Sequence, residues 1–554
     1  MNRSNVHLLD LPDEILFVIL KKLDNIDVLY SLFDINNGRL NILVQENIFS
    51  NILKFVSIDN TSIIDRFCID ILPRIHHNVK CFIFDPVFME RILLATDYPN
   101  LTKLKIVDFQ KEIAFNYFTN QSSLRSIFQE QITNLILINN DKGGRRGSSD
   151  IYDEGRMECS PKIYTKDVYD HILTFFKNLK KLTIIEPSVM LYPPLSLHYL
   201  PSTTFSSPIL THLYININGL HDCLCLLDGR LTKLTTLCVN VYNIDIEISP
   251  EIVHNMDKSF NLKCFSLQLF CPSQDYDEIV SLLRRMSNLE KLTLNISIYN
   301  RKRFIDVISG ADVQHDILNY MPQLRSFTFY ICTYVGPVTS PYKLSSEAIQ
   351  LTLANIRQPH ISSMVNYVHS VVHFGEGFRA ACSIFSLPFQ FDYLQDLGNH
   401  FPNIIFSYVT YLLLRDIIPF EHEFLVRIAR SFPSLKHLCI YNKKSQVSDG
   451  LMTLSSDNCQ LHSIIAYPHL TILDIKFSHK DYVEQFLNET KTFVPCLTEL
   501  EDATGFWSHK PGTGAVTNKD NTGSLISNPS VSNVSPWKLF CGYYIAQPSK
   551  INIR

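Results

Sequence analysis

The chain has 554 residues, of which 46% are hydrophobic and 19% charged, and its formal net charge is −4. This balance lacks the basic excess typical of nucleic-acid-binding proteins, and no apolar run reaches the roughly 18 residues of a membrane-spanning helix. The 14 cysteines are scattered without CxxC pairs, and carboxylates interrupt the first apolar stretch, so neither a disulfide framework nor a secretory signal is predicted. We therefore expect a cytoplasmic or nuclear protein that binds neither nucleic acid nor a membrane.

The segment at residues 8–23, LLDLPDEILFVILKKL, predicts an amphipathic helix near the N-terminus. Its apolar residues have the i, i+3, i+4, i+7 spacing of one helical face: Leu16, Ile19, Leu20 and Leu23. Pro12 suits a first helical position, and the two acidic residues after it favour the positive end of the helix dipole. Because the segment is too small to be a domain, we interpret it as a docking element. The alternative is that the stripe only packs on the residues that follow.

A short phrase, L-x-x-L-x-hydrophobic, recurs after residue 90, often at intervals of about 24–35 residues. Copies begin at Asn100, Asn178, Ile209, Lys233, Asn261, Asn288, Gln323, Tyr408, Ser434 and His469, and a partial copy begins at Cys496. Helix-compatible stretches that end in Pro or Asn precede several copies, as at residues 276–288. The pattern predicts an α/β leucine-rich-repeat solenoid, with a curved parallel sheet and outer helices. An ordinary α/β domain whose strands begin alike is the alternative.

The array is irregular between residues 330 and 408. There we expect a strand at Cys382–Pro388, a helix within Phe389–Asn403 and a degenerate strand at Leu351–Ile356. From residue 502 the chain is rich in Gly, Ser, Thr and Asn and is expected to be a disordered or atypical tail. The predicted division is therefore an N-terminal module at 1–50, a connecting or capping segment at 51–90, repeats at 91–501 and the tail at 502–554.

The N-terminal module resembles an F-box, whose pattern is roughly L-P-x-E-hydrophobic-L-x-x-I-L-x-x-L followed by an acidic break and a second helix. The matching positions are Leu11, Pro12, Glu14, Ile15, Leu16, Ile19, Leu20 and Leu23, followed by Asp24, Asp27, Val28 and Leu29. The residues of the expected third helix, Phe33–Val44, lack the tryptophan common in the family, and Arg39 or Leu40 lies near its place. Together with the repeats, the module resembles an F-box/leucine-rich-repeat protein with a three-helix F-box.

This resemblance implies a substrate-recognition subunit of an SCF-type cullin–RING ubiquitin ligase. The F-box would bind a Skp-family adaptor, and through it a cullin scaffold, while the repeats hold an unknown protein substrate. The implied adaptor contacts are Leu11, Pro12, Ile15, Leu16, Ile19, Leu20 and Leu23, supported by Val28 and Leu29. The alternative is a leucine-rich-repeat interaction scaffold that does not assemble with a ubiquitin ligase.

Residues that flank the second apolar position of each phrase are expected on the open face of the sheet, because side chains alternate along a strand. The substrate-binding candidates among them are Lys103, Lys105, Lys181, Tyr214, Lys291, Tyr411 and His437. The lysines suggest a groove that favours an acidic degron, and the alternative is an ordinary solvated polar face.

The sequence contains no phosphate-binding glycine loop and no HExxH motif. No Cys–His or Ser–His–Asp order stands out, and HSVVH at residues 369–373 has no third ligand nearby. We therefore expect a protein that is not an enzyme, with no catalytic residues, no cofactor and no metal.

Overall fold

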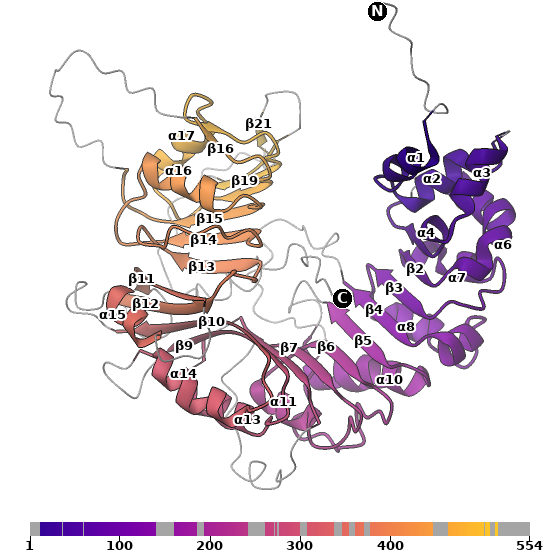
Figure 1. Cartoon of the computed structure of the whole chain (residues 1–554), viewed down its shortest axis with the longest axis horizontal. Coiled ribbons are helices and arrows are strands. Elements are labelled where there is room, and N and C mark those ends of the chain that lie inside the picture. The colour runs from indigo at the N-terminus through magenta and orange to yellow at the C-terminus, as the bar shows by residue number, and fades with distance from the viewer. Residues whose placement is uncertain are drawn as a thin grey trace, which may run out of the picture. The chain divides into compact units, whose positions relative to one another are not determined.

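The computed structural model describes residues 11–139 (without 36 and 59), 160–185, 193–241, 261–299 (without 271, 274 and 275), 307–336, 346–353, 360–370, 377–446, 464–502, 505–509 and 516–518. These residues form two compact units that divide after Cys264. Both units are mixed α/β structures in which helices accompany mostly parallel strands (Figure 1). None of the helices in these ranges is both long and apolar enough to cross a bilayer.

The first unit contains a parallel sheet whose strands follow one another in chain order. Every neighbouring pair from the first strand to the seventh is parallel. These strands are β1 (Ile52–Phe55), β2 (Cys81–Phe84), β3 (Lys103–Val107), β4 (Asn134–Ile138), β5 (Lys181–Ile185), β6 (His212–Ile217) and β7 (Thr236–Val241). Alternate residues are buried in several of these strands, as with Leu104 and Ile106 in β3, so one face of the sheet lies in the core.

Short helical elements connect these strands and lie along one side of the sheet (Figure 1). Before β1 come α1 (Asp13–Leu20), α2 (Asn25–Leu32), α3 (Gly38–Gln45) and α4 (Asn47–Ser50). The later α-helices are α5 (Thr61–Arg66), α6 (Leu72–Ile75), α7 (Met89–Leu93), α8 (Lys111–Tyr117), α9 (Pro161–Tyr164), α10 (His171–Phe175) and α11 (Leu220–Leu226). The 3₁₀ and π turns are η2 (Phe67–Ile71), η3 (His76–Asn78), η4 (Pro86–Phe88), η5 (Ile127–Gln131) and η8 (Thr165–Asp170).

Threonines just before the strands connect neighbouring units of the sheet. The Thr211 hydroxyl donates to the carbonyl of Lys180 at 2.9 Å, and the Thr235 hydroxyl donates to the carbonyl of Thr211 at 3.1 Å. The second unit repeats this arrangement, since the Thr498 hydroxyl donates to the carbonyl of Thr471 at 3.0 Å. The L-T-x-L form of the phrase therefore provides a hydroxyl that joins consecutive strand starts.

The second unit contains two main groups of strands. One has the order β8 (Cys264–Leu269), β9 (Lys291–Tyr299), β10 (Ser326–Val335), β12 (Gly377–Ser386) and β11 (Ile361–Ser370), in which β12 pairs antiparallel with both neighbours. The other has the order β13 (Tyr393–Leu397), β14 (Tyr411–Arg415), β15 (His437–Tyr441), β17 (Ile472–Asp474), β19 (Glu499–Asp502), β20 (Gly505–His509) and β21 (Val516–Asn518). A separate parallel pair joins β16 (Ile465–Ala466) and β18 (Thr492–Phe493).

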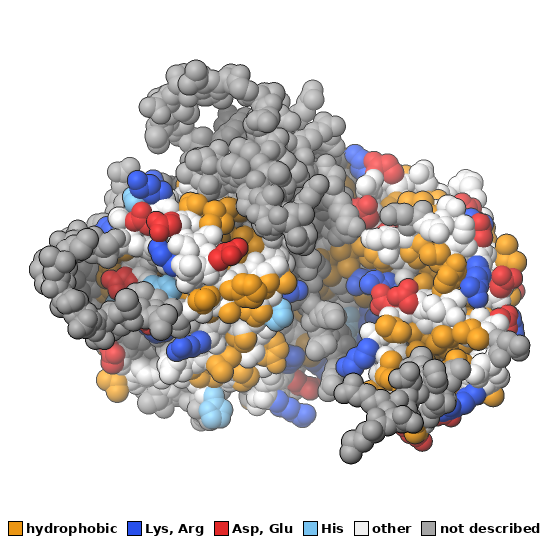
Figure 2. All heavy atoms as spheres, turned by 90° about the horizontal axis from the view of Figure 1, so that it is seen from above, with side chains coloured by type: hydrophobic (Ala, Val, Ile, Leu, Met, Phe, Trp, Pro, Cys, Tyr) orange, Lys and Arg blue, Asp and Glu red, His pale blue; other side chains and the backbone are white. Residues whose placement is uncertain are grey.

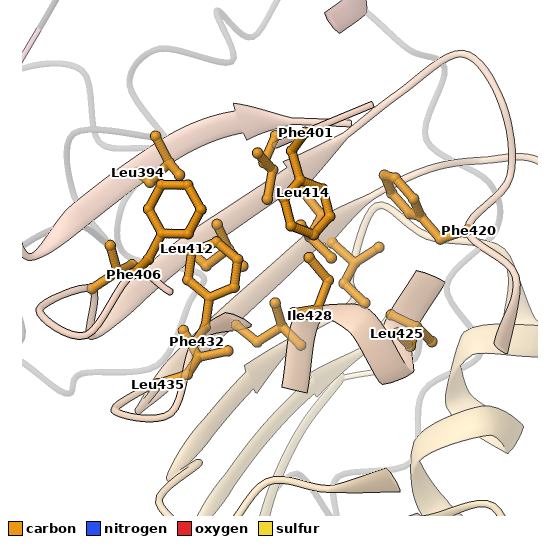
Figure 3. Close-up of a cluster of buried hydrophobic side chains, with 14 of the residues drawn as sticks. Leu394, Phe401, Phe406, Leu412, Leu414, Phe420, Leu425, Ile428, Phe432 and Leu435 are labelled. Carbon is orange, nitrogen blue, oxygen red and sulfur yellow. The ribbon is translucent and has the colours of Figure 1, made fainter. Parts of the chain in front are cut away.

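The core of the second unit lies between the β13–β14 strands and helix α16 (His422–Ser431) (Figure 3). Leu394 and Leu412 are fully buried there, and the stacked rings of Phe406 and Phe432 lie 4.7 Å apart. The remaining helical elements of this unit are α13 (Tyr276–Arg284), α14 (Gly310–Asp316), η9 (Leu318–Tyr320), α15 (Ser346–Thr352) and α17 (Lys480–Leu487). Burial on this scale makes the aromatic-rich interior a main source of stability.

The expected helix within Phe389–Asn403 is wrong, because this segment contains strand β13. Leu394 and Leu397 are three residues apart, which resembles helical spacing. The pairing with β14 shifts between them, and Asp396 has a φ of 55°. This extra residue turns both leucines into the core, as a β-bulge does.

One further expectation differs from the structure. The predicted strand at Leu351–Ile356 is wrong over Leu351 and Thr352, which end helix α15, while residues 354–356 lie outside the described ranges. Glu347 in the first turn of α15 stabilises that helix through the dipole. Within the segment expected to be a disordered or atypical tail, residues 505–509 and 516–518 form β20 and β21, and β20 pairs antiparallel with β19. The predicted strand at Cys382–Pro388 corresponds to the end of β12, which runs antiparallel to β10.

Candidate functional site

The N-terminal helices form a small core around Leu16. Leu16 is fully buried and packs with Leu40 and Leu43 of α3, and Leu11 and Phe17 lie at the edge of this cluster. Leu40 lies near the position where F-box proteins commonly have a tryptophan, and its side chain is 4% exposed. A leucine therefore occupies the interior at that point, and α3 closes the helical group.

Helix α1 also has an apolar face outside this core. Ile15 is 47% exposed, Val18 59% and Ile19 38%, and Leu23 just beyond the helix is 52% exposed. Residues 15, 18, 19 and 23 recur with helical spacing and lie on one side. We call Pro12, Ile15, Val18, Ile19 and Leu23 the α1 stripe. Figure 2 shows hydrophobic side chains among charged ones on the surface of the molecule.

The predicted adaptor contacts fall into two groups in the structure. Pro12, Ile15, Ile19 and Leu23 are exposed and Leu11 is half-buried, whereas Leu16, Leu20, Val28 and Leu29 are buried. The buried group is placed to hold the helices together and does not lie on the surface. Sequence reasoning missed Val18, and it missed Ile42 of α3, which is 70% exposed. Helical periodicity did not single out Val18, because α1 has apolar residues on both sides.

Polar contacts fix these helices against the sheet. The Asn25 amide at the start of α2 donates to the carbonyl of Ile52 at 2.9 Å and to that of Ile48 at 3.2 Å. The Arg66 guanidinium lies over the Tyr30 ring at 4.7 Å and donates to the carbonyl of Phe33 at 3.1 Å. The helical group is thereby attached to β1 and α5, which gives the α1 stripe a defined support.

Four substrate-binding candidates share one face of the sheet in the first unit. The pairing aligns Lys103, Asn134 and Lys181 in one row, and it aligns Lys105 with Tyr214 in the next. Lys103, Lys105 and Tyr214 are half-buried and Lys181 is exposed. Burial and the nearby charge of Lys103 lower the pKa of Lys105. Sequence reasoning missed Lys54 on β1, whose charge also acts on Lys105, because β1 does not carry the recurring phrase.

The other candidates belong to the second unit. Tyr411 and His437 are paired across β14 and β15, and their rings lie 4.3 Å apart. His437 is 8% exposed, and its burial lowers its pKa to about 4. Lys291 is exposed at the start of β9 and does not join this pair. These residues therefore form no single cluster.

One Cys–His contact occurs in helix α11. The Cys225 Sγ lies 3.5 Å from His221 Nε2. Burial raises the pKa of the Cys225 thiol to about 12 and lowers the pKa of His221, so both groups are held neutral. A neutral thiol beside a neutral imidazole is a poor nucleophile. Among the described residues, no group of three or more His, Cys, Asp or Glu side chains is arranged to hold a metal ion.

Comparison with protein-family models finds none that matches the chain, and comparison with curated proteins finds no match. The geometry of the α1 stripe and of the sheet faces is therefore the basis for a functional proposal.

Proposed function

We propose that this chain is the substrate-recognition subunit of an SCF-type cullin–RING ubiquitin ligase. The N-terminal helices act as an F-box that binds a Skp-family adaptor, and the sheet acts as a leucine-rich-repeat solenoid that binds the substrate protein. The ubiquitin transfer itself is carried out by other subunits. The chain contributes binding surfaces and no catalytic residue.

The observation that carries this proposal is the exposed α1 stripe at the start of the chain. Exposing Ile15, Val18 and Leu23 to water is unfavourable, and a partner that covers them gains about 25 cal/mol for each Å² of apolar surface buried. The charged ends of the stripe, Asp13 and Lys22, are also exposed and provide a polar rim. This combination is typical of a protein-interaction surface.

The solenoid interpretation is supported by the agreement between phrase and strand. The phrases that begin at Asn100, Asn178 and Asn288 contain the starts of β3, β5 and β9. From β1 to β7, each strand also pairs in parallel with the next one in the chain. Stacked units of this kind present an extended sheet face to partners.

The experiment is reconstitution with a purified Skp-family adaptor and cullin. The wild-type chain is expected to capture both proteins, and the Ile15→Asp/Ile19→Asp variant is expected to capture neither. The matched control is Ile69→Asp/Val87→Asp, since Ile69 is 70% and Val87 80% exposed outside helices α1–α4. If the wild-type chain captures no adaptor, the proposal is wrong and the scaffold without ligase assembly replaces it.

A further inference from the structure

Three lysines gather on the outer face of the first strands of the sheet. Lys54 of β1 is paired with Ile83 of β2, and Ile83 is paired with Lys105 of β3. Neighbouring strands are about 4.8 Å apart, so the backbones at Lys54 and Lys105 are separated by about 10 Å. Lys103 lies two residues before Lys105 on the same face, about 7 Å along the strand. We call Lys54, Lys103 and Lys105 the lysine face.

The charges of this face act on one another. Burial is the main cause of the lowered pKa of Lys105, and the charges of Lys103 and Lys54 lower it further. Cys81 lies beside Lys103 in the pairing, and burial raises its thiol pKa to about 11, so the thiol is neutral at pH 7. The carboxylate of Asp24 lies 3.6 Å from Lys54, but both side chains are more than half exposed and solvent weakens their interaction. The face therefore has positive charge that its own neighbours offset only weakly.

The strands of the first unit contain no acidic residue. From β1 to β7 they read ILKF, CFIF, KLKIV, NLILI, KLTII, HLYINI and TLCVNV. Ile83 and Ile136 are half-buried on the strands on either side of Lys105. The face thus combines ammonium groups with aliphatic surface between them.

We propose that the lysine face binds an extended acidic segment of a protein, in which carboxylate side chains alternate with other residues. Side chains two residues apart in an extended segment are about 7 Å apart on one side, which matches the spacing of Lys103 and Lys105. The methylene groups of the carboxylate side chains would lie against Ile83 and Ile136. This inference deepens the proposed function and rests on it in one respect, because the acidic segment would belong to the substrate.

A protein segment fits this face better than a nucleic acid does. Nucleic-acid grooves use many basic residues along the backbone and aromatic side chains on which bases stack. The lysine face contains no arginine, and the residues between its lysines are aliphatic. The chain as a whole has a net charge of −4. Charge complementarity with carboxylates therefore defines the partner.

The test is fluorescence anisotropy of the full chain with a labelled short peptide in which glutamate alternates with leucine or serine. The control peptide has glutamine in place of glutamate. The Lys103→Glu/Lys105→Glu variant is expected to bind the glutamate peptide at least about tenfold more weakly and to bind a lysine version of the peptide instead. The matched control is Lys166→Glu/Lys177→Glu, since both lysines are exposed among the helical elements. Lys103→Gln/Lys105→Gln is the milder variant should charge reversal prevent folding.

The outcomes separate this inference from the proposed function. Peptide binding that the two charge-reversal variants weaken equally, or no binding of the glutamate peptide to the wild-type chain, would overturn it. Binding of an oligothymidylate that depends on these lysines, without peptide binding, would overturn it as well. Adaptor capture is measured on the same samples. If capture succeeds and peptide binding fails, this inference alone is wrong; if peptide binding succeeds and capture fails, the lysine face remains and the ligase proposal is wrong.

Discussion

The guanidinium of Arg39 connects helix α3 to the start of helix α1 through Asp13. Arg39 Nε lies 2.5 Å from Asp13 Oδ1, and Arg39 Nη2 donates to the carbonyl of Leu11 at 2.6 Å. The contact spans 26 residues of the chain. It holds the Leu11–Pro12 backbone at the point where the α1 stripe begins.

Replacing Arg39 tests whether this contact orients the stripe. The Arg39 and Asp13 side chains are 41% and 53% exposed, so solvent screens the pair. We expect Arg39→Ala to lower the free energy of unfolding by less than about 1 kcal/mol and to weaken adaptor binding a few-fold. Arg39→Lys should recover the charge but not the two-point geometry. Calorimetry and adaptor titration measure both effects, and unchanged adaptor affinity in Arg39→Ala would show that the contact does not orient the stripe.

Neighbouring residues of α1 should respond differently to truncation. Leu16 is fully buried, so Leu16→Ala should cost about 2–5 kcal/mol of stability through lost packing and a residual cavity. Ile15 is 47% exposed, so Ile15→Ala should cost less than about 1 kcal/mol and act mainly on adaptor binding. Hydrogen exchange across α1–α3 reports the first effect and adaptor titration the second. Equal loss of stability in both variants would mean that the stripe is part of the core.

Asp396 is the polar centre of the bulge in β13. It accepts a hydrogen bond from the Tyr334 hydroxyl, and its Oδ1 lies 3.2 Å from Arg415 Nη1. Because the Asp396 side chain is only 6% exposed, Asp396→Ala removes a buried carboxylate from beside Arg415 and should cost about 3–5 kcal/mol. Asp396→Asn tolerates the positive φ and keeps a hydrogen-bonding side chain, so it should cost less. Denaturant unfolding compares the two, and an equal loss would show that the lost charge accounts for the whole cost and that the hydrogen-bonding side chain of the asparagine recovers nothing.

His437 makes the stability of the second unit depend on pH. Its folded pKa of about 4 is below the ordinary histidine pKa of 6.5, because burial disfavours the imidazolium. The unfolded chain therefore binds a proton that the folded chain refuses between pH 6.5 and about 4. This should lower the free energy of unfolding by about 3 kcal/mol as the pH falls through that window.

The comparison that isolates this effect is wild type against His437→Phe. Unfolding is measured from pH 7 to pH 4, and the stability difference between the two chains should change steadily as the pH falls. Asp474 acts with the opposite sign, since burial and the charge of Glu501 raise its pKa to about 6, and it is present in both chains. A difference that stays constant with pH would contradict the assignment to His437.

The recurring phrase predicted many strands because it places an apolar residue where the strand faces the core and polar residues on either side of it. The second leucine of NLTKLKI is Leu104, which is fully buried, and its neighbours Lys103 and Lys105 lie on the other face. No copy of the phrase was recognised in strands β1, β2 and β4, so the repeat did not identify these strands. At β13 the bulge separates Leu394 and Leu397 by three residues, which is a helical spacing, and a helix was therefore predicted where the structure has a strand.

The proposed docking surface was predictable only in part. Periodicity identified α1, but it cannot show which side of a helix faces the core when both sides are apolar. Leu16 and Leu20 are buried, while Ile15 and Ile19 are exposed, although all four fit the same pattern. The prediction of the lysine face from the sequence was incomplete, because it did not include Lys54. Lys54 becomes a neighbour of Lys105 only through the pairing of β1 with β2 and of β2 with β3.

The most direct test of the account is the dissociation constant between the full chain and a purified Skp-family adaptor, measured by isothermal titration. We expect binding by the wild-type chain, at least about a tenfold loss in Ile15→Asp/Ile19→Asp, and no change in Ile69→Asp/Val87→Asp. Equal affinity of all three chains, or no binding by any of them, would contradict the claim that the α1 stripe is an adaptor-docking surface.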